Sequence, residues 1–476
     1  MVFLSQLRRA DASPTTVLLI VSAGVIVASL DLFIVNVALP DLARDLNEPD
    51  LGVLSWVLNA YAIVYASLLV LFGRMADRYP RELGFLVGLA VFVAASAACA
   101  AANSVEALVA ARIVQAAGAA LLTPTSLSLI LATAPAERRA SSVRAWTAVG
   151  GLAAALGPVV GGLLAAASWR WVFLVNVPIG LLALAVGWRL LPRVPGHPVP
   201  RPDALGALLV TLGVGALSLG LVKGEDWGWA SASTAGTIVA GLALLAGFAL
   251  HCAHHRNPLV SPALFRVRAF TGSSAAMLLF SAGFGAMLLS VVLWAQGVWG
   301  WTALQTGLAI APGPLMVPIF AFGVAGRLIP RYGAGRVSVA GMLVFAAGIL
   351  WWAAAITVEP NYLTGVVPGM LLTGIGVGLT LPTLMAAATG ALPPTEFASG
   401  SGVVNMFRQV GLALGVAVLV AVLGQPAGSA EAALDTFRTG WIVTAGFSVA
   451  GAVTAAALLV RRTPTVVAAP QTEPAA

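Results

Sequence analysis

The chain has 476 residues, of which 59% are hydrophobic and only 9% are charged. Soluble domains carry about 25% charged residues, so this composition excludes a soluble enzyme, a secreted protein and a nucleic-acid binder. The formal net charge of +7 does not indicate nucleic acid, because most of the arginines lie in loops on one side of the topology predicted below. The composition predicts a polytopic membrane protein with the lipid bilayer as its environment.

Long, continuous apolar runs predict that the membrane spans are helices. A spanning helix needs about 20 apolar residues, whereas a transmembrane barrel shows alternating segments of about 10 residues. We expect fourteen helices at roughly these positions: 16–40, 52–73, 82–101, 105–133, 141–166, 170–191, 204–222, 233–250, 270–296, 304–326, 336–356, 362–388, 401–423 and 439–461.

The distribution of basic residues predicts the orientation, because cytoplasmic loops are enriched in lysine and arginine. With the N-terminus inside, 19 basic residues fall in cytoplasmic segments and 4 outside. We therefore expect an inner (plasma) membrane protein of a bacterium with both termini in the cytoplasm.

Two segments of the chain repeat at the same spacing of helices. The loop sequence from Gly73 to Tyr79 matches Gly326 to Tyr332 at four of seven positions, and the Thr-Pro-Thr at 123–125 parallels Leu-Pro-Thr at 381–383. This pattern predicts two related six-helix halves, which is a transporter design with the substrate site near the midplane. The expected division is as follows: 1–191 for the N-terminal half; 192–269 for a proline-rich linker, two inserted helices and a connector; 270–476 for the C-terminal half and a short tail.

A buried carboxylate is the sharpest functional signal. Among the acidic residues only Asp31 lies well inside a predicted span, and Arg112 lies at a similar depth on the fourth helix. A charge in the bilayer costs a few kcal/mol or more and marks a functional site by default. We therefore expect Asp31 to bind and release a proton, with Arg112 tuning its proton affinity. The competing interpretation is a static ion pair that only fixes packing.

Several other polar and aromatic side chains on the predicted spans are candidates for lining a substrate cavity. These are Asn36, Trp56, Asn59, Tyr61, Gln115 and Asn405. Interhelical hydrogen bonding explains the amides at least as well, and an interfacial aromatic belt explains Trp56. Arg408 lies about two turns inside the thirteenth predicted helix. It either snorkels to the interface or has a role that the sequence does not assign.

The sequence resembles the major facilitator superfamily, and within it the fourteen-helix drug:proton antiporters. The resemblance covers nearly the whole chain and rests on motifs in the correct order on the correct helices. The matching segments are Gly73–Arg81 between the second and third helices, Leu30–Pro40 in the first, Arg112–Gly118 in the fourth, Gly157–Gly162 in the fifth and Trp169–Gly180 in the sixth.

The resemblance implies a role for two groups of residues. Gly73, Asp77, Arg78 and Arg81 would form a cytoplasmic gate, in which charge-assisted bonds latch helix ends in one state. Gly157, Pro158, Gly161 and Gly162 would form the antiporter motif, whose glycines permit close helix approach. Pro80 and Glu82 depart from the usual loop pattern, which normally has a glycine and a basic residue there, and Ala153 replaces the usual leading glycine of the fifth-helix motif.

The sequence gives little support to enzymatic or metal chemistry. A Walker loop needs a lysine after glycine, whereas Lys223, the single lysine, follows Val222. No Ser/His/Asp arrangement is apparent. His251, Cys252, His254 and His255 offer spacings that could bind a metal, but they are better explained as the polar end of a helix. We expect no enzyme activity, no metal and no cofactor beyond a proton gradient.

These observations predict a proton-coupled efflux transporter that works by alternating access on antibiotics or dyes, and we expect it to be a monomer. Because the tenth and thirteenth predicted helices carry no acidic residue, we expect lipophilic substrates that are neutral or monocationic. Three alternatives stay open: a dedicated exporter of one natural product, a proton-coupled uptake symporter, and a structural or lipid-handling membrane protein.

Overall fold

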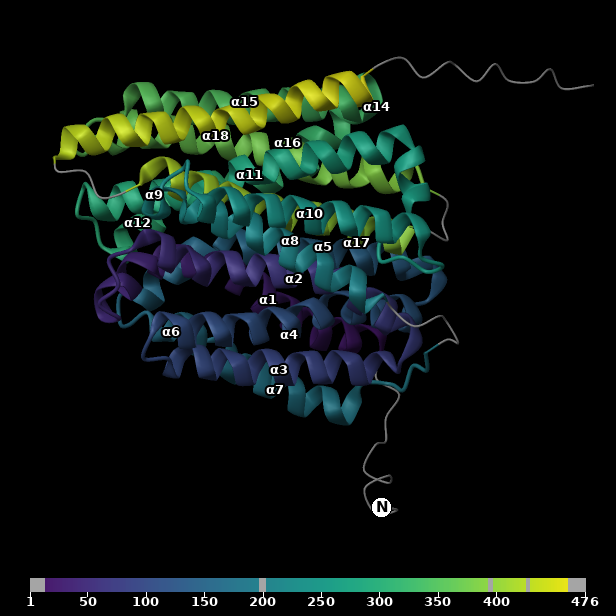
Figure 1. Ribbon diagram of the computed structural model, residues 1–476. Coiled ribbons are helices and arrows are strands. Elements are labelled where there is room, and N and C mark those ends of the chain that lie inside the picture. Colours follow the sequence, from purple (N-terminus) through teal and green to yellow (C-terminus); the bar gives the residue numbers. More distant parts are fainter. Residues whose placement is uncertain (1–12, 197–202, 393–396, 425–428, 461–476) are drawn as a thin grey trace, which may run out of the picture.

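The computed structural model describes residues 13–196, 203–392, 397–424 and 429–460 of the chain. Five arginines that contribute to the predicted orientation, Arg8, Arg9, Arg201, Arg461 and Arg462, lie outside these ranges, as do part of the predicted linker and the predicted tail. The described chain is a bundle of long, roughly parallel helices (Figure 1).

The helices follow one another in the predicted order. The N-terminal half comprises α1 (Pro14–Asp45), α2 (Leu51–Arg78), α3 (Arg81–Ala101), α4 (Val105–Thr133), α5 (Ala136–Ala165), α6 (Arg170–Leu174) and α7 (Asn176–Leu190). Between the halves lie α8 (Ala204–Val222), α9 (Gly224–Trp227), α10 (Ala232–His254) and the short η1 (Pro262–Arg266). The C-terminal half comprises α11 (Arg268–Gly297), α12 (Ala303–Ile310), α13 (Pro312–Pro318), η2 (Ile319–Ala325), α14 (Gly326–Tyr332), α15 (Ala334–Ala355), η3 (Tyr362–Val366), α16 (Val367–Gly390), α17 (Phe397–Leu423) and α18 (Ala430–Leu459).

Among the described residues, 13 helices are long and apolar enough to cross a membrane. The fifth predicted span corresponds to α5, a continuous helix of 30 residues, of which the stretch Leu156–Ala165 forms a shorter apolar segment. The chain is thus an all-helical, multi-pass membrane protein, as the sequence predicts. We call the end of the bundle where α1 begins and α18 ends the termini end, and the opposite end the distal end.

Helix boundaries differ from the predictions by a few residues at several ends, and two of the larger differences have a local cause. The tenth predicted span is four consecutive segments, α12, α13, η2 and α14, rather than one regular helix. Prolines at 312, 314, 318 and 330 explain this, because each removes a backbone N–H from the helical ladder. The last helix begins at Ala430 rather than 439, because Ser429 caps it by accepting a hydrogen bond from Ala432 N at 3.2 Å.

The packing within the two halves is the same. In the N-terminal half α1 packs on α5 and α7, and α3 packs on α4 and α7. In the C-terminal half α11 packs on α17 and α18, and α15 packs on α16 and α18. The contacts between the halves obey the same symmetry, because α2 packs on α17 and α5 packs on α12, while α1 meets α11.

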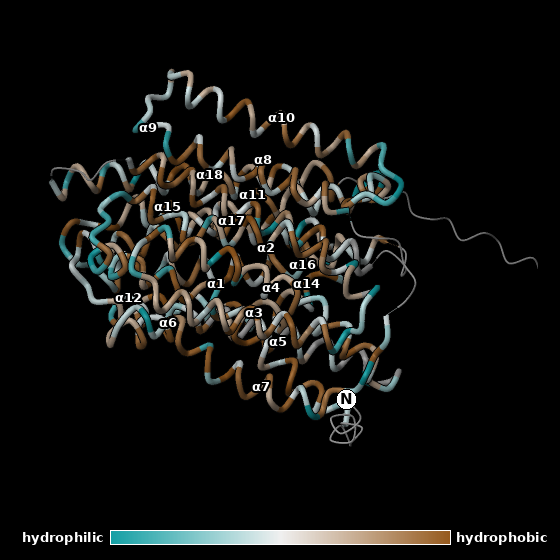
Figure 2. Tube along the Cα trace, turned by 60° about the horizontal axis from the view of Figure 1, so that its bottom comes forward, coloured by the Kyte–Doolittle hydropathy of each residue, from teal (hydrophilic) through white to brown (hydrophobic). Residues whose placement is uncertain are grey.

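The inserted pair α8 and α10 lies beside the seam between the halves. α8 packs on α2, α17 and α10, and α10 runs along the periphery of the bundle with an apolar surface (Figure 2). Only 11% of the apolar stretch of α10 is buried, compared with 78% for α11. An apolar helix with so little protein contact is suited to face lipid.

Candidate functional site

Asp31 and Arg112 meet inside the N-terminal half. Asp31 lies on α1 and Arg112 on α4, their side chains are 0% and 1% exposed, and Arg112 Nη1 pairs with Asp31 Oδ2. Removing two charges from water costs several kcal/mol per ion, and the mutual attraction offsets this only with good geometry and further hydrogen bonds. The structure supplies these bonds from four neighbouring helices.

The carboxylate of Asp31 accepts two amide hydrogen bonds in addition to the ion pair. Gln115 Nε2 on α4 and Asn176 Nδ2 at the start of α7 both donate to Asp31 Oδ1, at 2.9 and 3.0 Å. Gln115 also donates to Ser96 Oγ on α3 at 2.8 Å. From the sequence, Gln115 was predicted to line the substrate site and Asn176 was given no role. In the structure, both side chains bind the carboxylate of Asp31.

The guanidinium of Arg112 is held on three sides. Its Nε donates to Val57 O on α2 at 3.1 Å, and its Nη1 donates to Gln115 Oε1 at 2.6 Å. Its central carbon lies 4.0 Å from the centre of the Tyr61 ring, a geometry in which a cation is attracted to the ring face. Tyr61, predicted as a substrate-stacking residue, therefore contacts Arg112 instead.

A cavity of about 40 Å³ lies between the two halves, next to this ion pair. That volume has room for a few water molecules. Its walls come from α1, α2, α4, α11 and α17: Leu32, Phe33, Asn36, Leu58, Asn59, Ala62, Arg112, Gly285, Leu288, Leu412, Ala413 and Val416. Asn59 Oδ1 is buried without a hydrogen-bond partner, so this apolar cavity has an unused acceptor and the guanidinium of Arg112 in its wall.

Two of the predicted substrate residues, Asn36 and Asn59, line the cavity. The other four do not: Tyr61 and Gln115 contact the ion pair, Trp56 packs half-buried against the hydrophobic core, and Asn405 Nδ2 donates to Ser401 O at 3.1 Å within its own helix. The structure thus separates the predicted set into cavity walls, ion-pair supports and packing residues.

The predicted gate residues lie at the termini end: Gly73, Asp77 and Arg78 belong to the last turns of α2, and Arg81 begins α3. Here the loop contacts the segment after α7: Arg81 N donates to Val194 O at 3.0 Å, and Val194 N donates to the buried carboxylate of Glu82 at 2.9 Å. This second bond gives a role to the unusual Glu82. Gly73 has open space around it, since an added Cβ would meet only Pro124, at 3.9 Å. Arg78 lies at the C-terminal end of α2, and the side chain of Asp77 is outside the described residues.

The glycines of the predicted antiporter motif sit where three helices meet. A Cβ on Gly161 would lie 2.7 Å from Ile34 O on α1, and one on Gly162 would lie 2.5 Å from Ala303 O on α12. Gly157 faces α1 as well, with Phe33 Cβ at 2.8 Å from its ideal Cβ position. Distances below 3.0 Å require movement of a neighbour, so only glycine fits here. The motif therefore brings α5 into contact with α1 and, across the seam, with α12.

The halves also contact each other elsewhere at the distal end. Gln296 Nε2 near the end of α11 donates to Val37 O on α1 at 2.9 Å. A Cβ on Gly307 of α12 would lie 2.5 Å from Pro158 O on α5, which is the reciprocal of the contact at Gly162. These contacts close the seam on the distal side of the central cavity.

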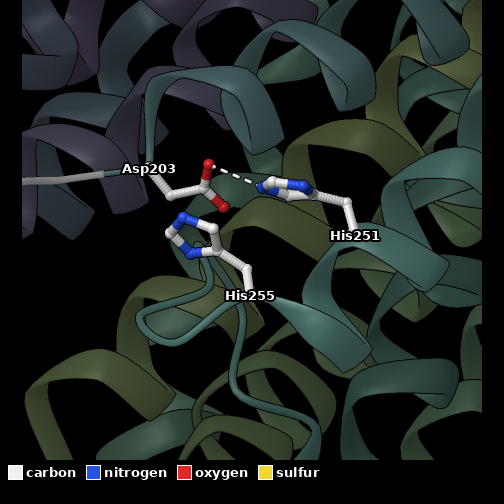
Figure 3. Close-up of side chains that lie close together, drawn as sticks. All are labelled: Asp203, His251 and His255. Carbon is white, nitrogen blue, oxygen red and sulfur yellow. Dashed lines mark hydrogen bonds and ion pairs between the residues drawn. The ribbon is translucent and has the colours of Figure 1, made fainter.

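A second polar cluster joins the two inserted helices at the termini end (Figure 3). Asp203 caps α8 by accepting from Gly206 N, and it also accepts from Leu259 N, both at 2.8 Å. Its Oδ1 lies 2.9 Å from His251 Nε2 on α10, and the His251 and His255 rings stack at 4.8 Å between centroids. One ligand atom from each of these three residues lies within 4.8 Å of the others, but both Asp203 oxygens are already bonded to backbone N–H groups, with which a metal would compete.

Burial acts to raise the pKa of Asp203, but the hydrogen bonds from Gly206 N, His251 and Leu259 N together lower it below its usual value. A depressed folded-state pKa means that the carboxylate stabilises the fold above its unfolded pKa, and that this stabilisation is lost as the pH falls through the folded value. The junction is therefore stable at neutral and mildly acidic pH.

We expect Asp203→Ala to destabilise the contact between α8 and α10 by about 1 kcal/mol or more, since it removes an N-cap and a buried acceptor. Cys252 of α10 is 6% exposed and Cys99 of α3 is 0% exposed, and both are free thiols. Maleimide should therefore label Cys252 faster in the variant than in the wild type, with Cys99 unchanged as the internal control. Equal labelling of Cys252 in both proteins would contradict this role for Asp203.

Comparisons with known proteins agree with the geometry. The Major Facilitator Superfamily profile matches residues 21–416 and, in a second match, residues 274–475. The chain is 34% identical over 428 residues to a cephamycin export protein of Amycolatopsis lactamdurans, covering 89% of this chain and 88% of that one. It is 35% identical over 449 residues to a puromycin resistance protein of Streptomyces alboniger, covering 91% and 88%.

Solved structures share the fold. The structure superimposes on a POT family transporter, PepTSo, with a TM-score of 0.68, 16% sequence identity and coverage of 94% of this chain and 97% of that one. The chain belongs to the major facilitator superfamily. It is therefore a member of a family of membrane transporters, and its relatives include antibiotic export and resistance proteins.

Proposed function

We propose that the protein exports lipophilic antibiotics from a bacterial cell in exchange for protons, by alternating access in the inner membrane. The observation that carries the proposal is the contact of a fully buried carboxylate, Asp31, with Arg112, which also lines the cavity between the halves. The names of the relatives support export or resistance as the direction and antibiotics as the substrate class. The termini would lie in the cytoplasm, and the working unit would be a monomer with protons and the substrate as its partners.

The exchange would run through the ion pair. In the state shown, Asp31 pairs with Arg112 and accepts from Gln115 and Asn176. A proton arriving from outside would neutralise the carboxylate and leave Arg112 without its anionic partner. Because Arg112 lines the cavity, a change in its position or the loss of its counter-charge would change the affinity of the cavity for a substrate. Release of the proton to the cytoplasm would restore the pair.

The energy available is sufficient for resistance. Moving one elementary charge through 100 mV is worth about 2.3 kcal/mol, so one proton through roughly 150 mV in total supplies about 3.5 kcal/mol. At about 1.4 kcal/mol per factor of ten, this sustains a gradient of a few hundredfold. One proton per substrate molecule is therefore enough.

The direct test is a panel of antibiotics against an efflux-deficient bacterium that carries either the gene or the empty vector. We expect the gene to raise the inhibitory concentration of one or more lipophilic antibiotics. Protection against several unrelated compounds indicates multidrug export, whereas protection against a single compound indicates a dedicated natural-product exporter, which the relatives' names equally support. Increased sensitivity with inward accumulation would favour an uptake symporter. No change with the protein present in the membrane would contradict the proposed function.

A further inference from the structure

Arg408 is a partly buried cation that nothing described above uses. It lies on α17, one helical turn from Leu412, which lines the central cavity. Its Nε is buried and has no hydrogen-bond partner. The described residues supply no ion pair to it either, although Arg112, the other arginine at the centre of the bundle, is paired with Asp31.

In the part of the chain that the structure describes, no acidic side chain is available to pair with Arg408. α17 packs on α2, α8, α11, α16 and α18. The acidic residues of these helices, Asp77, Glu431 and Asp435, all lie near helix ends. Asp31 is the one acid well inside the bundle, and it already binds Arg112. A charge at membrane depth costs a few kcal/mol, and no acidic side chain among the described residues pairs with Arg408 to offset that cost.

The helix that carries Arg408 packs against the helix that carries two tyrosines of the proton site. Arg408 lies on α17, which packs on α2, the helix of Tyr61 and Tyr65. The Tyr65 ring stacks on that of Tyr61 with 5.9 Å between centroids and an interplanar angle of 8°, and Arg112 lies over Tyr61. The Tyr65 hydroxyl bonds Thr123 Oγ1 on α4 at 2.9 Å.

We propose that Arg408 binds an anionic group of the transported solute, a carboxylate or another oxyanion. A guanidinium offers five N–H donors and no acceptor, and its planar fork matches such a group. The inference rests on the proposed export function and replaces the expectation from the sequence that the substrates are neutral or monocationic. The absence of acidic residues on the tenth and thirteenth predicted helices led to that expectation, whereas the uncompensated cation on α17 favours an anion.

The charge of the solute has a consequence for the energetics. Export of a monoanion in exchange for one proton moves two positive charges inward, so an inside-negative membrane potential drives both movements. Export of a monocation in the same exchange moves no net charge. Collapse of the potential with valinomycin and potassium should therefore slow export of an anionic solute.

The test compares three fluorescent probes in preloaded, efflux-deficient cells. Fluorescein is anionic, rhodamine 123 has the same xanthene ring system but is a cation, and Nile red is neutral. We expect the wild type to export fluorescein in preference to rhodamine 123. Arg408→Gln should lower the fluorescein efflux rate about tenfold or more, the usual effect of losing a hydrogen bond to a charged group, and leave Nile red within about twofold. Arg408→Lys should retain an intermediate rate, because it keeps the charge without the fork.

Two controls separate binding from folding and from surface charge. Arg268→Gln removes one exposed positive charge at the start of α11 and should leave all three rates unchanged. Arg408→Gln should unfold at the same temperature as the wild type or a higher one, because an unpaired, partly buried charge is removed. The inference is overturned if Arg408→Gln lowers Nile red and fluorescein efflux equally, which is a structural effect, or leaves fluorescein efflux intact. Antibiotic resistance without fluorescein efflux would contradict this inference alone, whereas the loss of both would contradict the proposed function.

Discussion

Asp31→Asn is expected to abolish export while the protein still reaches the membrane. An asparagine can accept from Gln115 and Asn176 through its oxygen, but it cannot take up and release a proton. Its second terminal atom, an amide nitrogen, would face Arg112 without attraction. The variant therefore keeps part of the hydrogen-bond network and loses the charge. Antibiotic resistance should fall to the level of the empty vector.

The same substitution has a stability cost that must be separated from the loss of coupling. Leaving one partner of a buried ion pair alone costs about 3–5 kcal/mol. The double variant Asp31→Asn with Arg112→Gln removes the lone cation, so its unfolding temperature should recover toward the wild-type value. Export should stay absent, because no titratable group has been restored.

This pair of variants distinguishes a proton carrier from a static ion pair. If the pair only fixed packing, the neutral double variant would recover both stability and export. Asp435→Asn serves as the matched control, since this exposed acid near the start of α18 pairs with Arg438 at 3.4 Å away from the cavity. It should leave export and stability unchanged.

Gly162→Ala is expected to give the second large effect. Its added Cβ would lie 2.5 Å from Ala303 O, which forces α5 and α12 apart at the distal end. Inserting a methyl group into such a contact costs about 1–3 kcal/mol. If this cost applies only to the conformation in which the two halves touch at the distal end, the population of that conformation drops roughly 5- to 150-fold. The rate of antibiotic efflux should fall accordingly.

The control for this substitution is another helical glycine with open space around it. Gly215 on α8 has nothing within 4 Å of an added Cβ, so Gly215→Ala should be neutral or slightly stabilising through helix propensity. Efflux at the wild-type rate in Gly162→Ala would show that the contact between α5 and α12 is not part of the transport cycle. Equal loss in both variants would point to a general effect of alanine.

The elements of the fold were predictable because each span carries its own signal in the sequence. Apolar runs, the loop arginines and the repeated segment around Gly73 and Gly326 indicate the helices and their duplication. The broken tenth span was not recognised, although its four prolines, at 312, 314, 318 and 330, were a visible signal. Charge in an apolar run identified Asp31 and Arg112 because desolvation makes such residues costly and therefore conspicuous.

The partners of the ion pair were harder to predict, because they depend on how helices approach one another. Asn176 reaches Asp31 only because α7 packs beside α1, and nothing in the local sequence shows this. Tyr61 was predicted to stack on a substrate, whereas the face of its ring is covered by Arg112. The lack of a partner for Arg408 is likewise a property of five surrounding helices rather than of its own segment.

The most direct test of proton-coupled export uses the purified protein in liposomes that contain a pH-sensitive dye. An antibiotic to which the protein gives resistance is added on one side, and both solute and proton movements are followed. If export is coupled to protons, antibiotic uptake into the liposomes is accompanied by proton movement out of them, and Asp31→Asn shows neither movement. Antibiotic transport by the wild type without proton movement, or with protons moving in the same direction, would contradict it.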